Sequence, residues 1–149
     1  MEIVRVNGLN EDFVMLTRCL EDFQYNFMPV LKDKGYELVS DLCDVDGYVL
    51  YVDDKPIGSI GLKKISEDCC EIVRVFVLNE YRGNGYAVML FEKIEKLARE
   101  KGFKEAEMVA WSLAKSALKL YDKLGYVKSE EKISEWFSGF GYVELHKNL

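Results

Sequence analysis

The sequence has few of the residues on which several common kinds of active site depend. It contains a single histidine, His146, and none of its four cysteines forms a C-x-x-C pair. A histidine-based metal site, a zinc knuckle and a Ser-His-Asp triad are therefore disfavoured, and we expect no metal ion. We expect the cysteines to be reduced and mostly buried.

Long apolar runs and basic stripes are absent as well. No run approaches the roughly 20 residues of a membrane-spanning helix, and residues 1–5 lack the basic and apolar regions of a signal peptide. We therefore expect no membrane association and a cytoplasmic location. A net charge of −6 argues against nucleic-acid binding. It favours a cationic partner such as an amine, although acidity that only keeps a protein soluble explains it equally well.

The composition that is present is typical of a folded globular protein. Of the 149 residues, 49% are hydrophobic and 31% are charged. A chain of this length buries roughly two-thirds of the surface that it exposes when unfolded. No linker or internal repeat interrupts it, so we predict a single domain over residues 1–149.

The patterns of apolar residues predict an α/β (α+β) fold with a mixed, mostly antiparallel sheet of about seven strands. The strands are expected at residues 2–6, 47–53, 57–65, 70–78, 104–111, 126–132 and 139–147. Helices are expected from the capping residue Asn10 to Pro29, at residues 87–101, and between Ser112 and Gly125.

The connections are less clearly marked. Residues 28–46 give a poor signal, with a turn at 32–35 and either a short helix or a loop at 36–44. A hairpin turn is expected at residues 53–56 from its composition. Residues 133–138 are expected to form an aromatic-bearing connection between the last two strands.

The helix at residues 87–101 joins strands 70–78 and 104–111 into a β-α-β unit, so these two strands should be the parallel central pair. Such crossovers are right-handed and place ligands beyond the carboxyl ends of the strands. Residues 79–85 lie at that end of the central strand.

Those residues include a glycine-rich turn that opens the helix. The first N–H groups of a helix have no partner within the helix, and its dipole favours an anion there. Gly83 and Gly85 lack the Cβ atoms that would keep a phosphate at a distance. The dinucleotide fingerprint fails because its third glycine is Val88, and no Walker loop is present. A tight turn without any ligand remains the alternative.

The run from Arg82 to Ala87 has the form R-x-x-G-x-A, which resembles the acyl-CoA-binding signature of the GNAT superfamily of N-acetyltransferases. The run from Ala117 to Tyr126 resembles the second signature of that family, A-x-x-x-Y-x-x-x-G-F/Y. Together with the order of strands and helices, the resemblance extends from about Gly47 to the C-terminus.

The resemblance implies that acetyl-CoA is the co-substrate and that the glycine turn binds its pyrophosphate. It also implies a bulge in the central strand that turns backbone amides toward the pantetheine arm and the thioester carbonyl. The residues that match these amides are Phe76 and Val77, and Leu78 is a lesser candidate. Many members carry an asparagine seven residues before the tyrosine of the second signature, where this chain has Ala114. The implied cofactor-binding residues are Phe76, Val77, Arg82, Gly83, Asn84, Gly85, Tyr86 and Ala87.

Two residues are implied to be catalytic. Tyr121 matches the tyrosine that gives a proton to the leaving thiolate, and Glu71 stands where a glutamate acts as the base in some members. The alternatives are a packed aromatic ring for Tyr121 and a strand salt bridge for Glu71. In the second case water, or a nearby carboxylate such as Asp68, would take the proton.

These features predict an N-acetyltransferase that moves an acetyl group to a primary amine by direct attack in a ternary complex. A covalent route is disfavoured because no cysteine has a histidine beside it in the sequence. The alternative is a non-catalytic acyl-CoA-binding sensor. The acceptor amine, small molecule or protein, is left open. A homodimer through the aromatic residues Trp136, Phe137 and Phe140 is also left open, since these are equally good core residues.

Overall fold

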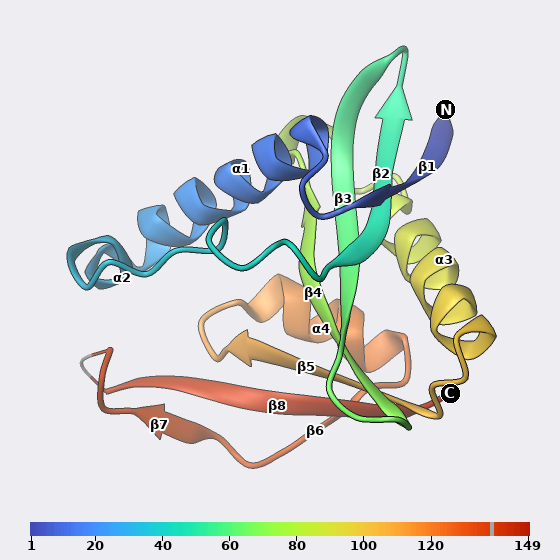
Figure 1. Cartoon of the computed structure of the whole chain (residues 1–149). Coiled ribbons are helices and arrows are strands. Elements are labelled where there is room, and N and C mark those ends of the chain that lie inside the picture. The colour runs from blue at the N-terminus through green and yellow to red at the C-terminus, as the bar shows by residue number, and fades with distance from the viewer. Residues whose placement is uncertain (138) are drawn as a thin grey trace.

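One mixed sheet forms the centre of the chain in the computed structural model, which describes residues 1–137 and 139–149 (Figure 1). The strands follow the order β1-β2-β3-β4-β5-β8-β6, and β7 pairs with β8. Their bounds are β1 (Glu2–Asn7), β2 (Asp46–Val52), β3 (Lys55–Lys64), β4 (Cys69–Val77), β5 (Glu105–Trp111), β6 (Val127–Lys128), β7 (Lys132–Ser134) and β8 (Phe140–Asn148).

Among the described strands, β4 and β5 form the parallel pair and the other pairs are antiparallel. This confirms the mixed, mostly antiparallel sheet and the parallel central pair. The parallel pairing follows from the intervening helix, which returns the chain to the N-terminal end of β4 before β5 begins.

Helices lie on both faces of the sheet. Figure 1 shows α1 (Glu11–Phe27) on one face and α3 (Tyr86–Glu100) on the other. The remaining helical segments are α2 (Pro29–Asp33), α4 (Lys115–Lys123) and the 3-10 turn η1 (Asn79–Tyr81). In the part of the chain that the structure describes, no helix is both long and apolar enough to cross a membrane.

The start of α1 confirms the predicted cap. The side chain of Asn10 accepts hydrogen bonds from the backbone N–H groups of Asp12 and Phe13, at 3.0 and 3.1 Å. Its first turn carries acidic side chains, which the positive end of the helix dipole stabilises. Phe13 and Leu16 on the inner face of α1 are fully buried against the sheet, whereas Phe23, further along the helix, is 41% exposed.

The strand expected at residues 126–132 is two short strands, which brings the sheet to eight strands instead of about seven. Strand β6 pairs with Leu145 and His146 of β8, whereas β7 pairs with its residues 140–142. Between them Ser129 bonds to Glu144 through both its backbone N–H and its side-chain oxygen, which interrupts the regular ladder. Ser138, the last residue of the expected connection, lies outside the described residues.

Two other connections also differ from expectation. The hairpin turn is shorter than residues 53–56: Asp53 and Asp54 both have positive φ, 50° and 63°, so β3 begins at Lys55. A two-residue turn of this kind matches the twist of the strands, and Pro56 consequently pairs with Tyr51. Residues 29–33, expected in part as a turn, form the short helix α2 with Pro29 in its first turn.

A buried ion pair joins α3 to the C-terminal strand. Glu95 on α3 is only 7% exposed, and the Nζ atom of Lys147 on β8 lies 2.9 Å from its Oε1 atom. The same Nζ donates to the backbone oxygen of Leu124 at 2.7 Å, and the hydroxyl of Tyr126 donates to Glu95 Oε2 at 2.8 Å. These bonds hold the end of α4, the helix that carries Tyr121, against α3 and β8.

Candidate active site

The parallel ladder between β4 and β5 is short. It pairs Cys69 with Glu105, Cys70 with Ala106 and Glu71 with Glu107, and it stops there. Beyond this point β5 stays paired with β8 and diverges from β4, as Figure 1 shows. The edge of β4 that follows Glu71 therefore has backbone groups without a neighbouring strand among the described residues.

A β-bulge lies in this same part of β4. The register with β3 shifts by one residue between the pairs Ser59–Phe76 and Gly61–Val73. Within the bulge Arg74 has a φ of 56°, which is unusual for a residue other than glycine. The hydroxyl of Ser59 donates to the backbone oxygen of Arg74 at 3.0 Å and so holds the bulge in place. The implied bulge is thus present, at residues 74 and 75.

Past the bulge lie the two residues whose backbone N–H groups were predicted to face the cofactor, Phe76 and Val77. One of these N–H groups faces the open edge, and the other faces β3. The N–H of Leu78 donates to the backbone oxygen of Ile57 on β3, at 2.8 Å. Backbone N–H groups alternate in direction along a strand, so Phe76 also directs its N–H to β3 and Val77 directs its N–H to the open edge. Val77 is the better placed of the two to donate to an acyl carbonyl.

The glycine turn leaves its amides free. Gly83 and Gly85 have φ of 81° and 78°, and a Cβ atom on either would meet no atom within 4 Å. The first helical bond runs from Met89 N to Gly85 O, and the N–H groups of residues 83–88 have no acceptor among the described residues. Such an array at the start of a 15-residue helix fits the phosphates of a nucleotide-bearing cofactor.

Arg82 connects this turn to β4 and α1. Its Nε atom donates to the backbone oxygen of Val77 at 2.9 Å. The guanidinium lies over the rings of Phe23 and Phe76, with 4.5 and 5.5 Å to the ring centroids. The side chain thus holds the turn in position, and its contribution to phosphate binding stays a prediction.

Tyr121 lies on the inner side of α4, partly buried. Its ring packs edge-to-face against Phe91 of α3, with 5.7 Å between centroids. Burial raises the pKa of the Tyr121 hydroxyl to about 12, and no described residue hydrogen-bonds to it. The hydroxyl therefore keeps its proton at neutral pH and has no fixed protein partner.

Glu71 is the last residue of β4 in the parallel ladder. It sits between Lys63 of β3 and Glu107 of β5 in the sheet register. Burial raises the pKa of the Glu71 carboxyl, and the positive charges of Lys63 and Arg74 partly counter that rise. A partly buried carboxyl with a raised pKa and no hydrogen bond is suited to accept a proton.

One residue of the region had no signal in the sequence. Arg74 was missed because only the three-dimensional register reveals the bulge that it occupies. Ala114, which the sequence marked as a departure from the family pattern, is the N-cap of α4 and makes no side-chain cap bond. Within the described residues no group of three or more His, Cys, Asp or Glu side chains gathers as a metal site.

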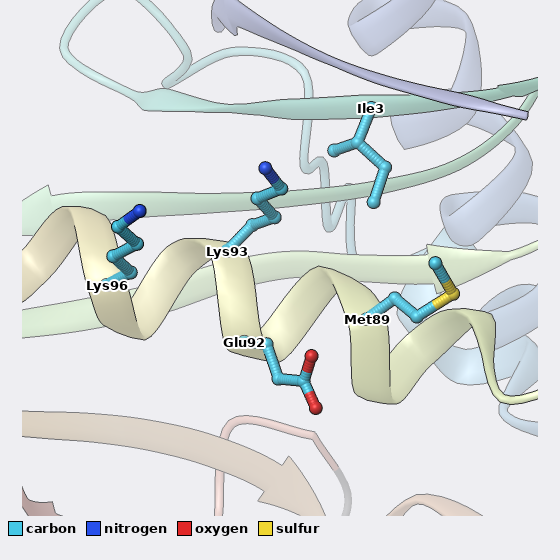
Figure 2. Close-up of a pocket in the computed structure, with 5 residues that line it drawn as sticks. All are labelled: Ile3, Met89, Glu92, Lys93 and Lys96. Carbon is cyan, nitrogen blue, oxygen red and sulfur yellow. The ribbon is translucent and has the colours of Figure 1, made fainter.

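The hollow in Figure 2 lies away from these residues. It has a volume of about 240 Å³ and is lined by Ile3, Met89, Glu92, Lys93 and Lys96. Figure 2 shows Lys93 and Lys96 of α3 extending toward the side on which Ile3 of β1 lies. None of the predicted site residues lines it.

Known proteins resemble the chain in sequence and in fold. A Bacillus subtilis protein of uncharacterised function, YxbD, is 35% identical over 85 residues, which cover 56% of this chain and 52% of that protein. This chain spans about half the length of the curated relatives it matches. A candidate acyl-CoA N-acyltransferase from Klebsiella pneumoniae superposes with a TM-score of 0.80 at 17% identity, over 99% of this chain and 97% of that one.

A GNAT family acetyltransferase from Elizabethkingia anophelis, solved with acetyl-CoA bound, superposes with a TM-score of 0.72 at 13% identity, over 99% of this chain and 97% of that one. At such identities these structures establish the fold alone. The model of the acetyltransferase (GNAT) family matches residues 16–126, well over half of the sequence. The chain therefore belongs to the acetyltransferase (GNAT) family.

Proposed function

We propose that the protein transfers an acetyl group from acetyl-CoA to a primary amine, by direct attack in a ternary complex. The observation that carries the proposal is the open edge of β4. The free amides of the glycine turn lie beyond one end of this edge, and Glu71, a carboxyl with a raised pKa, stands at the other.

When bound, acetyl-CoA would supply an acetyl thioester. The chain has hydrogen-bond donors for two parts of this molecule, the pyrophosphate and the acyl oxygen. The N–H groups of residues 83–88 would hold the pyrophosphate. The N–H of Val77, which faces the open edge, would donate to the acyl oxygen and stabilise the negative charge that develops on it. A neighbouring GNAT acetyltransferase was solved with acetyl-CoA bound, which supports the same ligand here.

Glu71 would act as the base. An amine with a pKa of about 10.4 is mostly protonated at pH 7, and making it neutral costs on the order of 4–5 kcal/mol. A carboxyl with a raised pKa is a stronger base than an exposed one, so it recovers part of this cost when it takes the proton. Tyr121, which burial keeps protonated, would give a proton to the departing thiolate.

Thermal unfolding with and without acetyl-CoA, followed by a free-thiol release assay over a panel of amines, tests the proposal. Acetyl-CoA at a hundredfold excess over its dissociation constant should stabilise the fold by about 2.7 kcal/mol. A thermal shift with thiol release for some amines supports the enzyme. A shift without release for any amine favours the acyl-CoA sensor, and the absence of a shift contradicts both.

The pH profile tests the role of Glu71. Its carboxyl must be ionised to accept a proton, so the rate should rise as pH increases through its raised pKa. Glu71→Gln should abolish that rise and lower the plateau by about 10²-fold or more. The measurement is kcat/KM for a good acceptor amine between pH 5 and pH 9.

Glu107→Gln is the matched control, because Glu107 pairs with Glu71 across the ladder and its charge adds to the rise in the Glu71 pKa. Removing this charge should shift the profile to lower pH without flattening it. If Glu71→Gln leaves the wild-type profile unchanged, water or another carboxylate is the base.

A further inference from the structure

Among the described residues, the guanidinium of Arg74 has one hydrogen-bond partner, and its other donors have none. Its Nε atom donates to the backbone oxygen of Leu38 at 3.0 Å. No Asp or Glu among the described residues forms an ion pair with it, although the side chain is partly buried. A guanidinium presents five N–H donors in a planar fork that suits a carboxylate. In the described part of the chain, no carboxylate accepts from these N–H donors of Arg74.

Fold stability alone gives little reason for an arginine at this position. A residue other than glycine at a φ of 56° costs free energy. Burial of a charge without an opposite charge in contact also costs free energy, and burial lowers the pKa of Arg74 accordingly. A bulge built on glycine would avoid both costs, so the arginine points to a ligand.

Arg74 lies on the acceptor side of the proposed reaction, close to the base. Its charge counters the rise in the pKa of Glu71, and it likewise counters the rise in the pKa of Tyr36. Glu71 ends the ladder and Arg74 sits in the bulge three residues later, so both lie where β4 and β5 part. The two side chains are therefore close enough for their charges to interact, although they form no ion pair.

Aromatic rings from three distant segments gather around Tyr36, two residues before the Leu38 carbonyl to which Arg74 donates. The ring of Tyr36 lies 6.3 Å from that of Trp111, at the end of β5, and 5.5 Å from that of Phe137. Trp111 and Phe137 are 5.4 Å apart. Phe137 is 7% exposed and packs within the chain, whereas Trp136 is 60% exposed, and the homodimer stays a prediction.

The loop that carries Tyr36 and Leu38 is held by α1. The hydroxyl of Tyr25 donates to the backbone oxygen of Tyr36, and the buried carboxylate of Glu21 accepts from the N–H of Leu38. Glu21 Oε2 also lies 3.3 Å from the N–H of Val39. Arg74 is thus bonded to a fixed loop, so its free donors have a fixed position before any ligand arrives.

We propose that the acceptor is a free amino acid with a large apolar or aromatic side chain. The donors of Arg74 bind its carboxylate, Glu71 receives the proton of its ammonium group, and the rings of Tyr36 and Trp111 line the position of its side chain. A purely cationic acceptor leaves Arg74 without a partner and is repelled by it. The inference rests on the proposed acetyl transfer and names its substrate class.

Pairs of acceptors that differ only at the carboxyl group test this assignment. Phenylalanine, leucine, methionine and tryptophan would each be compared with the corresponding amide, by thiol release with acetyl-CoA. The wild-type enzyme should prefer at least one free acid over its amide. Arg74→Gln should reduce kcat/KM for that acid by about 10–100-fold, mainly through KM, and should change the amide little. Arg74→Lys should restore part of the loss, because it keeps the charge without the fork.

Arg18→Gln is the matched control, since it removes the same charge from an exposed position on α1. It should leave the ratio of acid to amide unchanged. If wild type prefers every amide, or if Arg74→Gln slows acid and amide equally, Arg74 only holds the loop and the assignment is wrong. Thiol release with other amines but with no amino acid would also overturn it while leaving acetyl transfer intact. A protein that neither binds acetyl-CoA nor releases thiol would contradict the proposed function instead.

Discussion

Tyr121→Phe should lower turnover by about 10²-fold or more while changing the affinity for acetyl-CoA little. The substitution removes one hydroxyl and keeps the ring that packs against Phe91 at 5.7 Å. Since the hydroxyl has no hydrogen bond to a described residue, the stability of the free protein should stay close to that of wild type. The loss should therefore appear in kcat, because the proton that the thiolate needs is missing.

Tyr126→Phe is the control, because Tyr126 also packs against the ring of Phe91, with 5.8 Å between centroids. Its hydroxyl donates to the buried Glu95, so the change should reduce stability by about 1–2 kcal/mol and leave kcat nearly unchanged. Steady-state kinetics and thermal unfolding of both variants separate the two roles. An equal loss of turnover and of acetyl-CoA affinity in Tyr121→Phe, or no loss, would exclude the acid role.

Gly85→Glu should weaken acetyl-CoA binding by at least about 10²-fold. Gly85 has a φ of 78° and open space where a Cβ would be, directly beside the free amides that begin α3. A side chain fills that space, and a carboxylate about 4 Å from a pyrophosphate costs about 4 kcal/mol at an effective dielectric constant of 20. Calorimetric titration with acetyl-CoA measures the effect.

The same substitution at the other end of α3 separates the effect of a negative charge beside the free amides from the effect of backbone strain. Gly102 also has a positive φ, 90°, and open space at its Cβ position. It follows α3, whose 15 residues span about 22 Å, so Gly102→Glu introduces similar strain and the same charge far from the turn. This variant should lose stability and keep acetyl-CoA affinity. If Gly85→Glu binds acetyl-CoA as tightly as wild type, or if both variants lose equal affinity, the glycine turn does not bind the pyrophosphate.

The glycine turn that we propose to bind the cofactor was predictable because its signals are local in the chain. A change from strand to helix periodicity, two glycines and the R-x-x-G-x-A signature all fall within residues 71–87. The structure places the turn, its positive φ angles and the start of α3 where these signals indicated. The same locality explains why the Asn10 cap was predicted correctly.

The proposed acceptor side could not be predicted, because its members are far apart in the sequence. Tyr36, Arg74, Trp111 and Phe137 come from a loop, a bulge, a strand end and a connection, and no pattern within any one of these segments marks it. Residues 36–44 gave no clear prediction at all. Their position follows from bonds to α1 that no spacing rule describes.

The sequence by itself thus determined the order of the elements, the family and the turn that fits a phosphate, because each depends on neighbouring residues and on the period of apolar side chains. Only the tertiary structure decided where β4 and β5 part, which amide of β4 faces the opening, and that Arg74 forms no ion pair with any described residue although its charge acts on Glu71. These features depend on strand register and on contacts between distant segments, and register is settled only when the whole sheet packs.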